Sequence, residues 1–407
     1  MKILFISSNS SPRGGGEDFM IYLCRAYSKF NKNLFGIYSN KNYMNKFVDK
    51  IERYTKEVVK IKYKELSQRN LRFLSSIFDI NQIFKIYKAI NKIKPNLIII
   101  NQQYDEDALE IIISSTFYKL INNSSVKISS VIHMPRIENK INKQPFGFAR
   151  YIVLLIIYGI LDPILLLTTK ECLEEFRKYY FFNKKKSFLV KSPLPEIKKR
   201  IGKKYSLEII NKSNIPKFAK VKLNNWLKNK RQIILLGCQM KTQKNPLFAL
   251  SCWMKLRKMH KSSACFLIIG DGPLKNIIDQ QISNLELNER KDILQINWVP
   301  ELSQYILISD LLLMPSSFEG MNLTLLECIS YNKDVILSKF EGITELQKYA
   351  RNCHQIIKFD EKIWAKKIHE KLSFQNKNKR KNSLNKKFIS YYSDYECFNS
   401  FKKSINF

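Results

Sequence analysis

The stretch LLLMPSSFEGMNLTLLEC, residues 311–328, contains the pattern that decides the fold class. Its first residues form an apolar run that is long enough for a buried strand and too short for a helix. The apolar and polar residues of LTLLECISY then recur at helical offsets. We therefore predict a strand, a loop that carries Glu319, and a helix that begins near Asn322 and carries Glu327 in its first two turns. The free N–H groups at the start of that helix would favour an anion in the loop.

Apolar runs of strand length recur along the whole chain, with helical segments between them. The runs of the first half are KILFIS, NLIII, VKISSVIH, ILLLTT and SFLVKS, and those of the second half are QIILLG, CFLIIG, ILQINWV, LLLMPS, DVILS and HQIIKF. Continuous runs of this kind are typical of parallel strands that are covered on both faces. The sequence therefore predicts an α/β protein with two Rossmann-like domains.

A chain of 407 residues is long for one hydrophobic core, and its composition changes in the middle. We predict an N-terminal domain over residues 1–190, an inter-domain segment over 191–231 that is rich in lysine and proline, and a C-terminal domain over 232–375. The charged and then aromatic tail, residues 376–407, is predicted to form a helix whose apolar face packs back on the N-terminal domain.

The most apolar stretch, residues 151–167, is interrupted by Asp162 and Pro163. Eleven residues before the break are fewer than the roughly 20 that a membrane-spanning helix needs. We therefore predict a buried helix, a break and a buried strand. The eight cysteines are scattered without a CxxC pair, and no secretory signal is present at the N-terminus, which favours a cytoplasmic protein with reduced thiols.

The formal net charge of +35 favours an anionic partner such as a lipid surface, a polyanionic substrate or nucleic acid. The basic residues are dispersed and no nucleic-acid-binding motif is present, so binding of nucleic acid is not expected. Candidate membrane contacts are residues 41–65 and the basic runs near residues 183–200, where lysines alternate with aromatic residues.

Several polar or glycine-rich stretches follow predicted strands, where open α/β sheets bind their ligands. They contain Gly14, Gly15, Gly16 and Glu17 after the first strand, His133 after VKISSVI, Lys241 and Lys244 after QIILLG, and Gly270, Asp271 and Gly272 after CFLII. Glycine allows the backbone to approach a phosphate or a sugar closely, and a lysine can contact a diphosphate.

Glu319 and Glu327 are eight positions apart, which corresponds to roughly 12 Å along a helix axis. Carboxylates at that distance cannot share one proton or one metal ion, but they can hold the two ends of a long ligand.

The ordered set LLGCQMKTQKNP, LIIGDGP, INWVP, LLLMPSSFEGMNLTLLEC and DVILSKFEGITEL resembles the donor domain of retaining GT-B glycosyltransferases of family four, or group 1. The resemblance is continuous from Ile233 to Glu345. It is thinner in the first half, where residues 14–17 are similar to the glycine-rich loop on the acceptor side. His133 falls where the family often has an active-site histidine.

The resemblance implies two Rossmann-like domains that face each other across a cleft, and transfer of a sugar from a nucleotide diphosphate donor without a metal ion or other cofactor. It implies that Glu319 contacts the donor sugar, that Glu327 contacts the ribose hydroxyls, and that Lys244 contacts the diphosphate. Further donor-binding residues are expected to be Lys241, Gly272, Gly320, Met321, Asn322 and Leu323. Glu319 and His133 are the expected catalytic residues, and Gly15, Gly16 and Glu17 are expected on the acceptor side.

The sequence departs from the family pattern at Gln239, where the family usually has an arginine on the phosphates, and Lys241 is a candidate substitute. Asp105 and Asp107 in YDEDALE resemble a metal-binding DxD motif, but their place before a predicted helix favours capping acids. A catalytically weakened GT-B relative and a sugar-nucleotide epimerase are the alternative functions.

The expected acceptor is a glycan or a lipid-linked glycan used in the synthesis of cell-surface polysaccharide. The expected location is the cytoplasm, with peripheral attachment to the inner face of the cell membrane.

Overall fold

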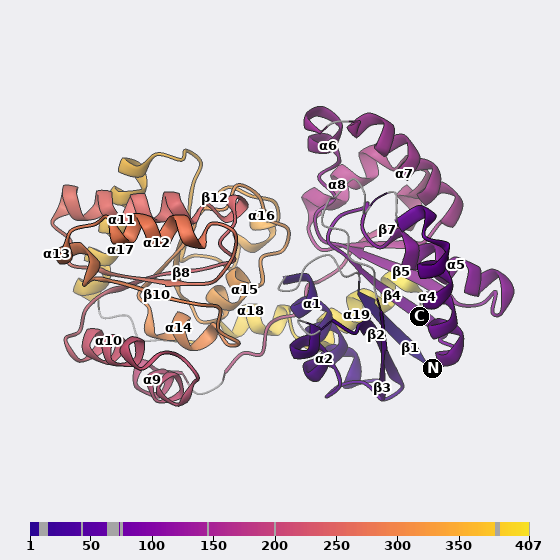
Figure 1. Cartoon of the computed structure of the whole chain (residues 1–407), viewed down its shortest axis with the longest axis horizontal. Coiled ribbons are helices and arrows are strands. Elements are labelled where there is room, and N and C mark those ends of the chain that lie inside the picture. Colours follow the sequence, from indigo (N-terminus) through magenta and orange to yellow (C-terminus); the bar gives the residue numbers. More distant parts are fainter. Residues whose placement is uncertain are drawn as a thin grey trace. The chain divides into compact units, whose positions relative to one another are not determined.

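The computed structural model describes residues 1–7, 15–41, 44–62, 73, 76–144, 146–198, 201–378 and 383–406, with the backbone alone at 46 and 374–378. These residues form two compact units (Figure 1). Unit 1 comprises Met1–Pro195, Gly320–Leu323 and Ser390–Phe407, and unit 2 comprises Glu196–Glu319 and Thr324–Ile389.

Unit 1 contains a seven-stranded sheet in the order β3-β2-β1-β4-β5-β6-β7, and every neighbouring pair is parallel. Its strands are β1 (Ile3–Ser7), β2 (Leu34–Ser39), β3 (Glu57–Ile61), β4 (Leu97–Gln102), β5 (Lys127–Ile132), β6 (Ile164–Leu167) and β7 (Ser187–Leu189). Its helices are α1 (Gly15–Ser28), α2 (Asn45–Ile51), α4 (Ile80–Ile93), α5 (Leu109–Ile121), α6 (Ile137–Lys143), α7 (Gly147–Leu161), α8 (Lys170–Tyr179), the 3₁₀ helix η2 (Phe181–Lys186) and α19 (Asp394–Ile405).

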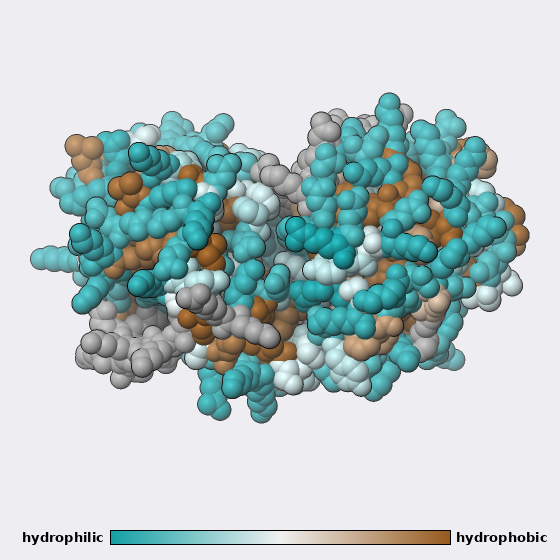
Figure 2. All heavy atoms as spheres, turned by 90° about the horizontal axis from the view of Figure 1, so that it is seen from below, coloured by the Kyte–Doolittle hydropathy of each residue, from teal (hydrophilic) through white to brown (hydrophobic). Residues whose placement is uncertain are grey.

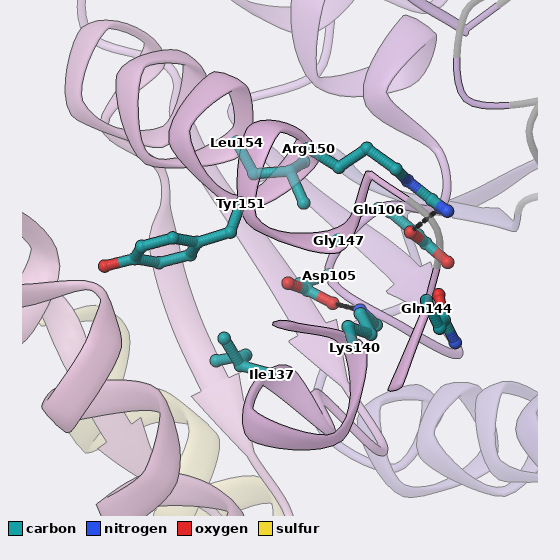
Figure 3. Close-up of a pocket in the computed structure, with 9 residues that line it drawn as sticks. All are labelled: Asp105, Glu106, Ile137, Lys140, Gln144, Gly147, Arg150, Tyr151 and Leu154. Atoms are coloured by element: carbon teal, nitrogen blue, oxygen red, sulfur yellow. Dashed lines mark hydrogen bonds and ion pairs between the residues drawn. The ribbon is translucent and has the colours of Figure 1, made fainter. Parts of the chain in front are cut away.

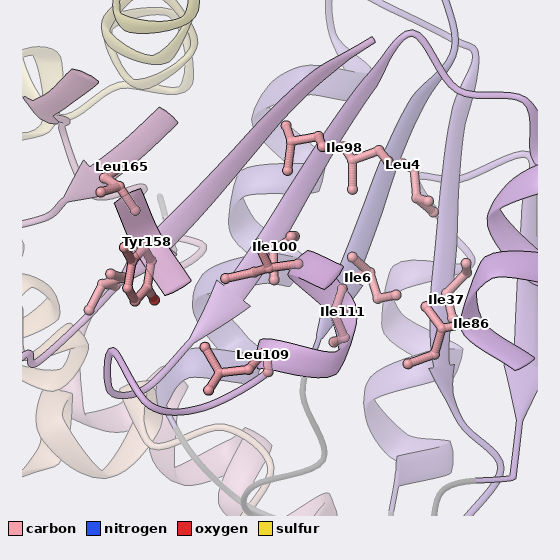
Figure 4. Packing of buried hydrophobic residues seen from close by; sticks show 14 of the residues in the cluster. Leu4, Ile6, Ile37, Ile86, Ile98, Ile100, Leu109, Ile111, Tyr158 and Leu165 are labelled. Carbon is pink, nitrogen blue, oxygen red and sulfur yellow. The ribbon is translucent and has the colours of Figure 1, made fainter. Parts of the chain in front are cut away.

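Alternate residues of each strand of unit 1 enter two different cores, because neighbouring side chains of a strand point to opposite faces. Leu4 and Ile6 of β1 pack with α4, α5, α7 and α8 (Figure 4). Ile3 and Phe5 pack with α1, α2 and α19 on the other face. Both faces of the sheet are therefore covered, which explains why the central strands have continuous apolar runs.

Helix α19 packs against α1. Its residues Cys397, Phe401 and Ile405 are buried, and Asp394 in its first turn forms an ion pair with Arg25 at 2.8 Å. The C-terminal end of the chain thus belongs to the core of unit 1.

Unit 2 contains a six-stranded parallel sheet in the order β10-β9-β8-β11-β12-β13. Its strands are β8 (Ile233–Gly237), β9 (Cys265–Ile269), β10 (Ile293–Ile296), β11 (Leu311–Met314), β12 (Asp334–Ser338) and β13 (Cys353–Ile356). Its helices are α9 (Lys203–Lys212), α10 (Lys217–Lys228), η3 (Thr242–Lys244), α11 (Pro246–His260), α12 (Lys275–Ser283), α13 (Leu287–Arg290), α14 (Ser303–Ile308), α15 (Leu323–Ser330), α16 (Ile343–Leu346) and α17 (Glu361–Asn378). Helix α18 (Lys386–Tyr391) lies where the chain passes from unit 2 to unit 1.

The predicted α/β fold class with two Rossmann-like sheets is confirmed, and each quoted apolar run overlaps a strand. Strands β2 and β3 were not predicted. The lysine-rich segment after residue 195 contains α9 and α10 and belongs to unit 2.

The stretch 151–167 forms the predicted helix, break and strand, but the prediction that its helix is buried was wrong. Ile152, Val153, Ile156 and Ile160 of α7 are exposed. In the part of the chain that the structure describes, no helix has the length and apolar character needed to cross a membrane. On the face drawn in Figure 2, hydrophilic residues predominate and hydrophobic residues lie in smaller groups between them.

Candidate donor and acceptor sites

The order of the strands reverses between β1 and β4 in unit 1 and between β8 and β11 in unit 2. Open parallel sheets bind ligands at such switch points, beyond the carboxyl ends of the strands, because the loops on the two sides diverge there. The predicted site residues follow β1 and β5 in unit 1 and β8, β9 and β11 in unit 2, so they lie at these positions or after a neighbouring strand.

In unit 2, Lys244 after β8 meets Glu319 after β11. The Nζ atom of Lys244 forms an ion pair with Oε1 of Glu319, and the side chains are 19% and 7% exposed. The hydroxyl of Ser316 donates a second hydrogen bond to the same carboxylate oxygen over 2.7 Å. A largely buried carboxylate therefore lies in contact with a largely buried ammonium group and a hydroxyl donor.

One side-chain and one backbone hydrogen bond, both to backbone carbonyl oxygens, join the loops after β8 and β11. Nε2 of Gln243 donates to the carbonyl oxygen of Phe318 over 2.7 Å, and the N–H of Ser317 donates to the carbonyl oxygen of Gln243 over 2.8 Å. The N–H of Glu319 lies 3.4 Å from Oε2 of Glu341, which follows β12. Three loops thus converge on Glu319, and Glu341 was not predicted to be near it.

The loop after β9 lies at the same edge of the sheet and packs closely against the loop after β8 at Gly272. Gly272 has a φ of +151°, and a Cβ atom there would lie 2.6 Å from the carbonyl oxygen of Met240, so a side chain cannot be accommodated. The N–H of Met240 donates to the carbonyl oxygen of Asp271, and the N–H of Leu274 donates to that of Met240, both over 2.9 Å. Close packing of the β8 and β9 loops therefore requires Gly272, a predicted donor-binding residue.

Lys241 is a second cation at this edge. Burial, and then the positive charge of Lys244, lower the pKa of Lys241 below its ordinary value. Burial raises the pKa of the neighbouring Cys238 thiol to about 12, so it stays protonated. A diphosphate that bound here would relieve the repulsion between the two ammonium groups. Gln239 lies in the same loop, and its carbonyl oxygen accepts a hydrogen bond from the N–H of Lys241 over 2.9 Å.

The predicted placement of the two glutamates is confirmed at the level of secondary structure. Glu319 lies in the loop after β11, and Glu327 lies in the second turn of α15, which begins one residue after Asn322. Gly320, Met321 and Asn322 form the end of the loop, and Leu323 is the first residue of the helix. Glu327 is 9% exposed.

In unit 1, a chain of hydrogen bonds links the predicted acceptor-side residues. Ser7 at the end of β1 donates to Oε1 of Glu17 over 2.7 Å. Nδ2 of Asn101 in β4 donates to Oγ of Ser7 over 3.0 Å and to the carbonyl oxygen of Gly16 over 3.2 Å. Oδ1 of Asn101 lies 2.8 Å from Nε2 of His133. The side chains of Ser7, Glu17, Asn101 and His133 are all buried.

This chain fixes the tautomer of His133. The carbonyl oxygen of Gly16 can only accept, so the amide nitrogen of Asn101 faces it and the amide oxygen faces His133. His133 must therefore donate from Nε2, which leaves Nδ1 as the unprotonated nitrogen. Burial lowers the pKa of His133 to about 4, so the imidazole is neutral at pH 7. The ring also makes an edge-on contact with Phe19, with centroids 4.6 Å apart.

Glu17 carries a proton at neutral pH. Burial, opposed by the hydrogen bond from Ser7, raises its pKa to about 8. Its Oε1 atom accepts from Ser7, whereas Oε2 is buried and has no hydrogen-bond partner among the described residues. The protonated carboxyl group can therefore donate a hydrogen bond to a ligand oxygen.

The prediction that the glycine-rich segment forms a loop was wrong for Gly15 and Gly16, because α1 begins at Gly15; Glu17 lies in the first turn of that helix. Gly14 lies outside the described residues. Ser7 and Asn101 were not predicted, although a polar residue at the carboxyl end of a buried strand could have indicated them. No feature of the sequence indicated that Gln243 and Glu341 would lie beside Glu319.

The acidic motif YDED forms ion pairs, so the prediction that it caps a helix was wrong. Asp105 pairs with Lys140 and accepts a 2.6 Å hydrogen bond from Tyr180, and Glu106 pairs with Arg150. Figure 3 shows both pairs beside a small pocket of unit 1. The N-cap residue of α5 is Ala108, which makes no side-chain capping bond. Within the described ranges, no group of three or more His, Cys, Asp or Glu residues could hold a metal ion.

Comparison with known proteins shows similarity to glycosyltransferases. Residues 219–388 match the family described as glycosyl transferases group 1. The Escherichia coli protein UDP-Gal:alpha-D-GlcNAc-diphosphoundecaprenol alpha-1,3-galactosyltransferase is 32% identical over 101 residues. That match spans only 25% of this chain and 26% of the length of the relative.

The whole chain resembles solved glycosyltransferase structures. Anabaena HepE, solved in complex with UDP and glucose, has a TM-score of 0.71 at 12% identity, over 100% of this chain and 99% of that chain. WaaG, a glycosyltransferase involved in lipopolysaccharide biosynthesis, has a TM-score of 0.62 at 13% identity, over 99% and 98% of the two chains. At such identities the likeness concerns the fold alone, and it confirms the predicted GT-B fold class.

Proposed function

We propose that this protein transfers a hexosyl group from a nucleotide diphosphate sugar with retention of configuration. Two findings support this proposal: residues 219–388 match the glycosyl transferases group 1, and the chain has the GT-B fold. The observation that carries the proposal is the Lys244–Glu319 pair at the switch point of unit 2. It combines a cation for a diphosphate with a carboxylate for sugar hydroxyls, in the part of the chain that matches the family.

Unit 2 binds the donor in this account. Lys244 and Lys241 neutralise the diphosphate, which would compete with Glu319 for the ammonium group of Lys244. Glu319 then accepts hydrogen bonds from the donor sugar, and Glu327 accepts them from the ribose. The backbone of Gly272 and of residues 320–323 approaches the sugar and the phosphates. Charge neutralisation by lysines and backbone N–H groups makes a metal ion or other cofactor unnecessary.

Unit 1 binds the acceptor through His133, Glu17 and the N-terminal turn of α1 at Gly15 and Gly16. The neutral imidazole of His133 offers a hydrogen-bond acceptor at Nδ1, and the protonated carboxyl group of Glu17 offers a donor at Oε2. A sugar hydroxyl can use both kinds of group, because it donates and accepts at one oxygen.

The acceptor is a glycan or a lipid-linked glycan in the synthesis of cell-surface polysaccharide, and the protein works in the cytoplasm at the membrane. The related Escherichia coli protein acts on a diphosphoundecaprenol-linked sugar and uses UDP-Gal, according to its name. We therefore propose UDP as the first nucleotide to test.

A thermal-shift screen tests the donor class. The protein is heated with UDP, GDP, ADP and their common sugars, and the unfolding of unit 2 is followed. A ligand at 100 times its dissociation constant adds about 2.7 kcal/mol to the free energy of unfolding. We expect one nucleotide series to raise the unfolding temperature of the wild type and to have much less effect on Lys244→Ala. If no nucleotide at millimolar concentration changes the unfolding temperature, the proposal of a donor site in unit 2 is wrong.

A further inference from the structure

Helix α7 has an exposed side without a single polar side chain. Its exposed residues are Phe148, Ala149, Ile152, Val153, Ile156, Gly159 and Ile160. They cover an arc of roughly 140° at about 100° per residue. Phe148, Ile156 and Ile160 are 62%, 54% and 75% exposed. An ordinary surface helix has its charged residues on this side and its apolar residues on the other.

The polar side chains of α7 instead fasten it to unit 1. Arg150 forms an ion pair with the buried Glu106, as Figure 3 shows. The hydroxyl of Tyr151 donates to the carbonyl oxygen of Tyr179 over 2.8 Å, and that of Tyr158 donates to the carbonyl oxygen of Asp105 over 2.7 Å. These bonds determine which side of α7 faces outward, so the exposure of its apolar arc is a fixed feature of the unit.

Three neighbouring phenylalanines extend this arc. Phe146 precedes the helix and is 80% exposed, and Phe181 and Phe182 in η2 are 54% and 66% exposed. A Cβ atom at Gly159 would lie 3.7 Å from Cδ2 of Phe182, so η2 lies directly beside the exposed side of α7. We call the exposed residues of α7, together with Phe146, Phe181 and Phe182, the α7 surface.

Lysines lie at both ends of the α7 surface. Lys143 ends α6 just before the helix, and Lys184, Lys185 and Lys186 follow Phe182 in η2; all four are exposed. The nearest exposed acid in sequence, Asp162, is paired with Lys186. For Lys143, Lys184 and Lys185, the described part of the chain provides no ion-pair partner. The surface therefore combines an apolar centre with a basic rim.

We propose that the α7 surface docks on a bilayer that contains anionic phospholipid. The apolar arc would enter the boundary between headgroups and acyl chains, and the lysines would contact lipid phosphates. Helix α7 has 15 residues and its inner side is bonded to unit 1, so it would lie along the bilayer. The inference rests on the proposed function for its biological role, since a docked enzyme reaches a lipid-linked acceptor.

The basic rim favours a lipid surface over a second copy of the chain. A twofold interface through the α7 surface would bring the same residues of two copies together, because both copies use the same patch. The lysines of the two rims would then be close to one another and would repel. Lipid phosphates have the opposite charge.

Flotation of the full-length protein with vesicles tests the proposal without any transfer reaction. We expect binding to vesicles with anionic phosphatidylglycerol at low salt, weaker binding at high salt, and little binding to phosphatidylcholine alone. Ile156→Glu should weaken binding at least tenfold. Leu287→Glu is the matched control, since it adds the same charge at a 76% exposed apolar residue of unit 2, and it should bind like the wild type.

A second pair of variants tests the rim. Lys184→Gln with Lys185→Gln should weaken binding roughly thirtyfold, because each basic residue near an anionic surface strengthens attachment about fivefold. Lys362→Gln with Lys366→Gln removes two exposed lysines of α17 and should have no effect.

Three results would overturn the proposal. The first is the absence of wild-type binding to anionic vesicles at low salt. The second is equal weakening by a variant and its matched control. The third is a dimer, seen by light scattering, that Ile156→Glu dissociates. Nucleotide affinity, measured on the same variants, separates this proposal from the proposed function. Ile156→Glu should bind the nucleotide as the wild type does. If the wild type binds vesicles but no nucleotide, the proposed function is wrong and the docking proposal stands.

Discussion

Replacing Glu17 with glutamine should abolish a pH dependence in the stability of unit 1. Glutamine keeps the shape of the side chain and an oxygen that accepts from Ser7, but it cannot titrate. The folded protein holds the proton of Glu17 up to a pH of about 8, whereas the unfolded chain releases it near the ordinary value of 4.5. Because the folded state binds the proton more tightly, stability is greatest below pH 4.5 and falls as the pH rises toward 8.

The magnitude follows from the pKa. A difference of one bound proton changes the free energy of unfolding by about 1.4 kcal/mol for each pH unit. The whole window corresponds to a loss of roughly 5 kcal/mol, of which roughly 1 kcal/mol falls between pH 7 and 8, where the folded state itself begins to ionise. Glu110, whose pKa burial raises to about 7, also titrates in this interval, but it does so in both the wild type and Glu17→Gln, whereas the folded-state pKa of His133, about 4, lies below the interval. The difference between the wild type and Glu17→Gln from pH 7 to 8 therefore isolates the contribution of Glu17.

The two units can be observed separately in this experiment. All four tryptophans, Trp226, Trp253, Trp298 and Trp364, belong to unit 2, so their fluorescence reports on unit 2 and serves as an internal control. Hydrogen exchange of the amides in β1 and β4 reports on unit 1. We expect the wild type to lose protection in these strands between pH 7 and 8 relative to Glu17→Gln, after correction for the intrinsic exchange rate. If the difference between the two proteins does not change with pH, Glu17 is ionised in the folded state and the reasoning is wrong.

Three further predictions concern unit 2. Glu319→Gln should chiefly lower kcat, since the proposed function places this carboxylate on the reacting sugar. Glu327→Ala should chiefly weaken nucleotide binding by roughly 1 to 3 kcal/mol, the usual cost of a lost hydrogen bond; steady-state kinetics and calorimetric titration distinguish these effects. Lys244→Ala should lower both the stability of unit 2 and nucleotide affinity because Glu319 loses its ion-pair partner, and adding Glu319→Gln should restore stability but not affinity in denaturation and titration experiments. Gln239→Arg should keep or raise the affinity for a nucleoside diphosphate and Lys241→Ala should lower it, and an unchanged affinity in Lys241→Ala would show that this lysine takes no part in phosphate binding.

The strands that escaped prediction have identifiable physical features. Strand β2 has Gly36 in its centre, where a Cβ atom would lie 3.2 Å from Val58 of β3. The close contact with β3 favours a residue without a side chain there, and this glycine interrupts the apolar run of the sequence. Strand β3 is at the edge of the sheet and is only partly buried, and its two exposed residues, Glu57 and Lys60, are charged. Neither segment has the continuous apolar run that predicted the central strands.

Site residues could be predicted only where a short stretch of sequence contains a recognisable motif. Glu319 and Lys244 are recognisable from local spacing, and they do meet at one edge of the sheet. The network of Ser7, Asn101 and His133 joins three strands that are far apart in sequence, so it depends on the strand order. The exposure of α7 could not be predicted either, because a helix with so few polar residues is normally buried.

Hydrogen exchange in the presence of a nucleotide sugar tests the location of the donor site most directly. The protein is labelled with and without a saturating UDP-sugar, and the amides of both units are compared peptide by peptide. We predict slower exchange in residues 239–245 after β8 and in residues 316–327 around Glu319 and the start of α15. Bound nucleotide sugar that leaves the exchange of both segments unchanged would contradict the assignment of the donor to Lys244 and Glu319.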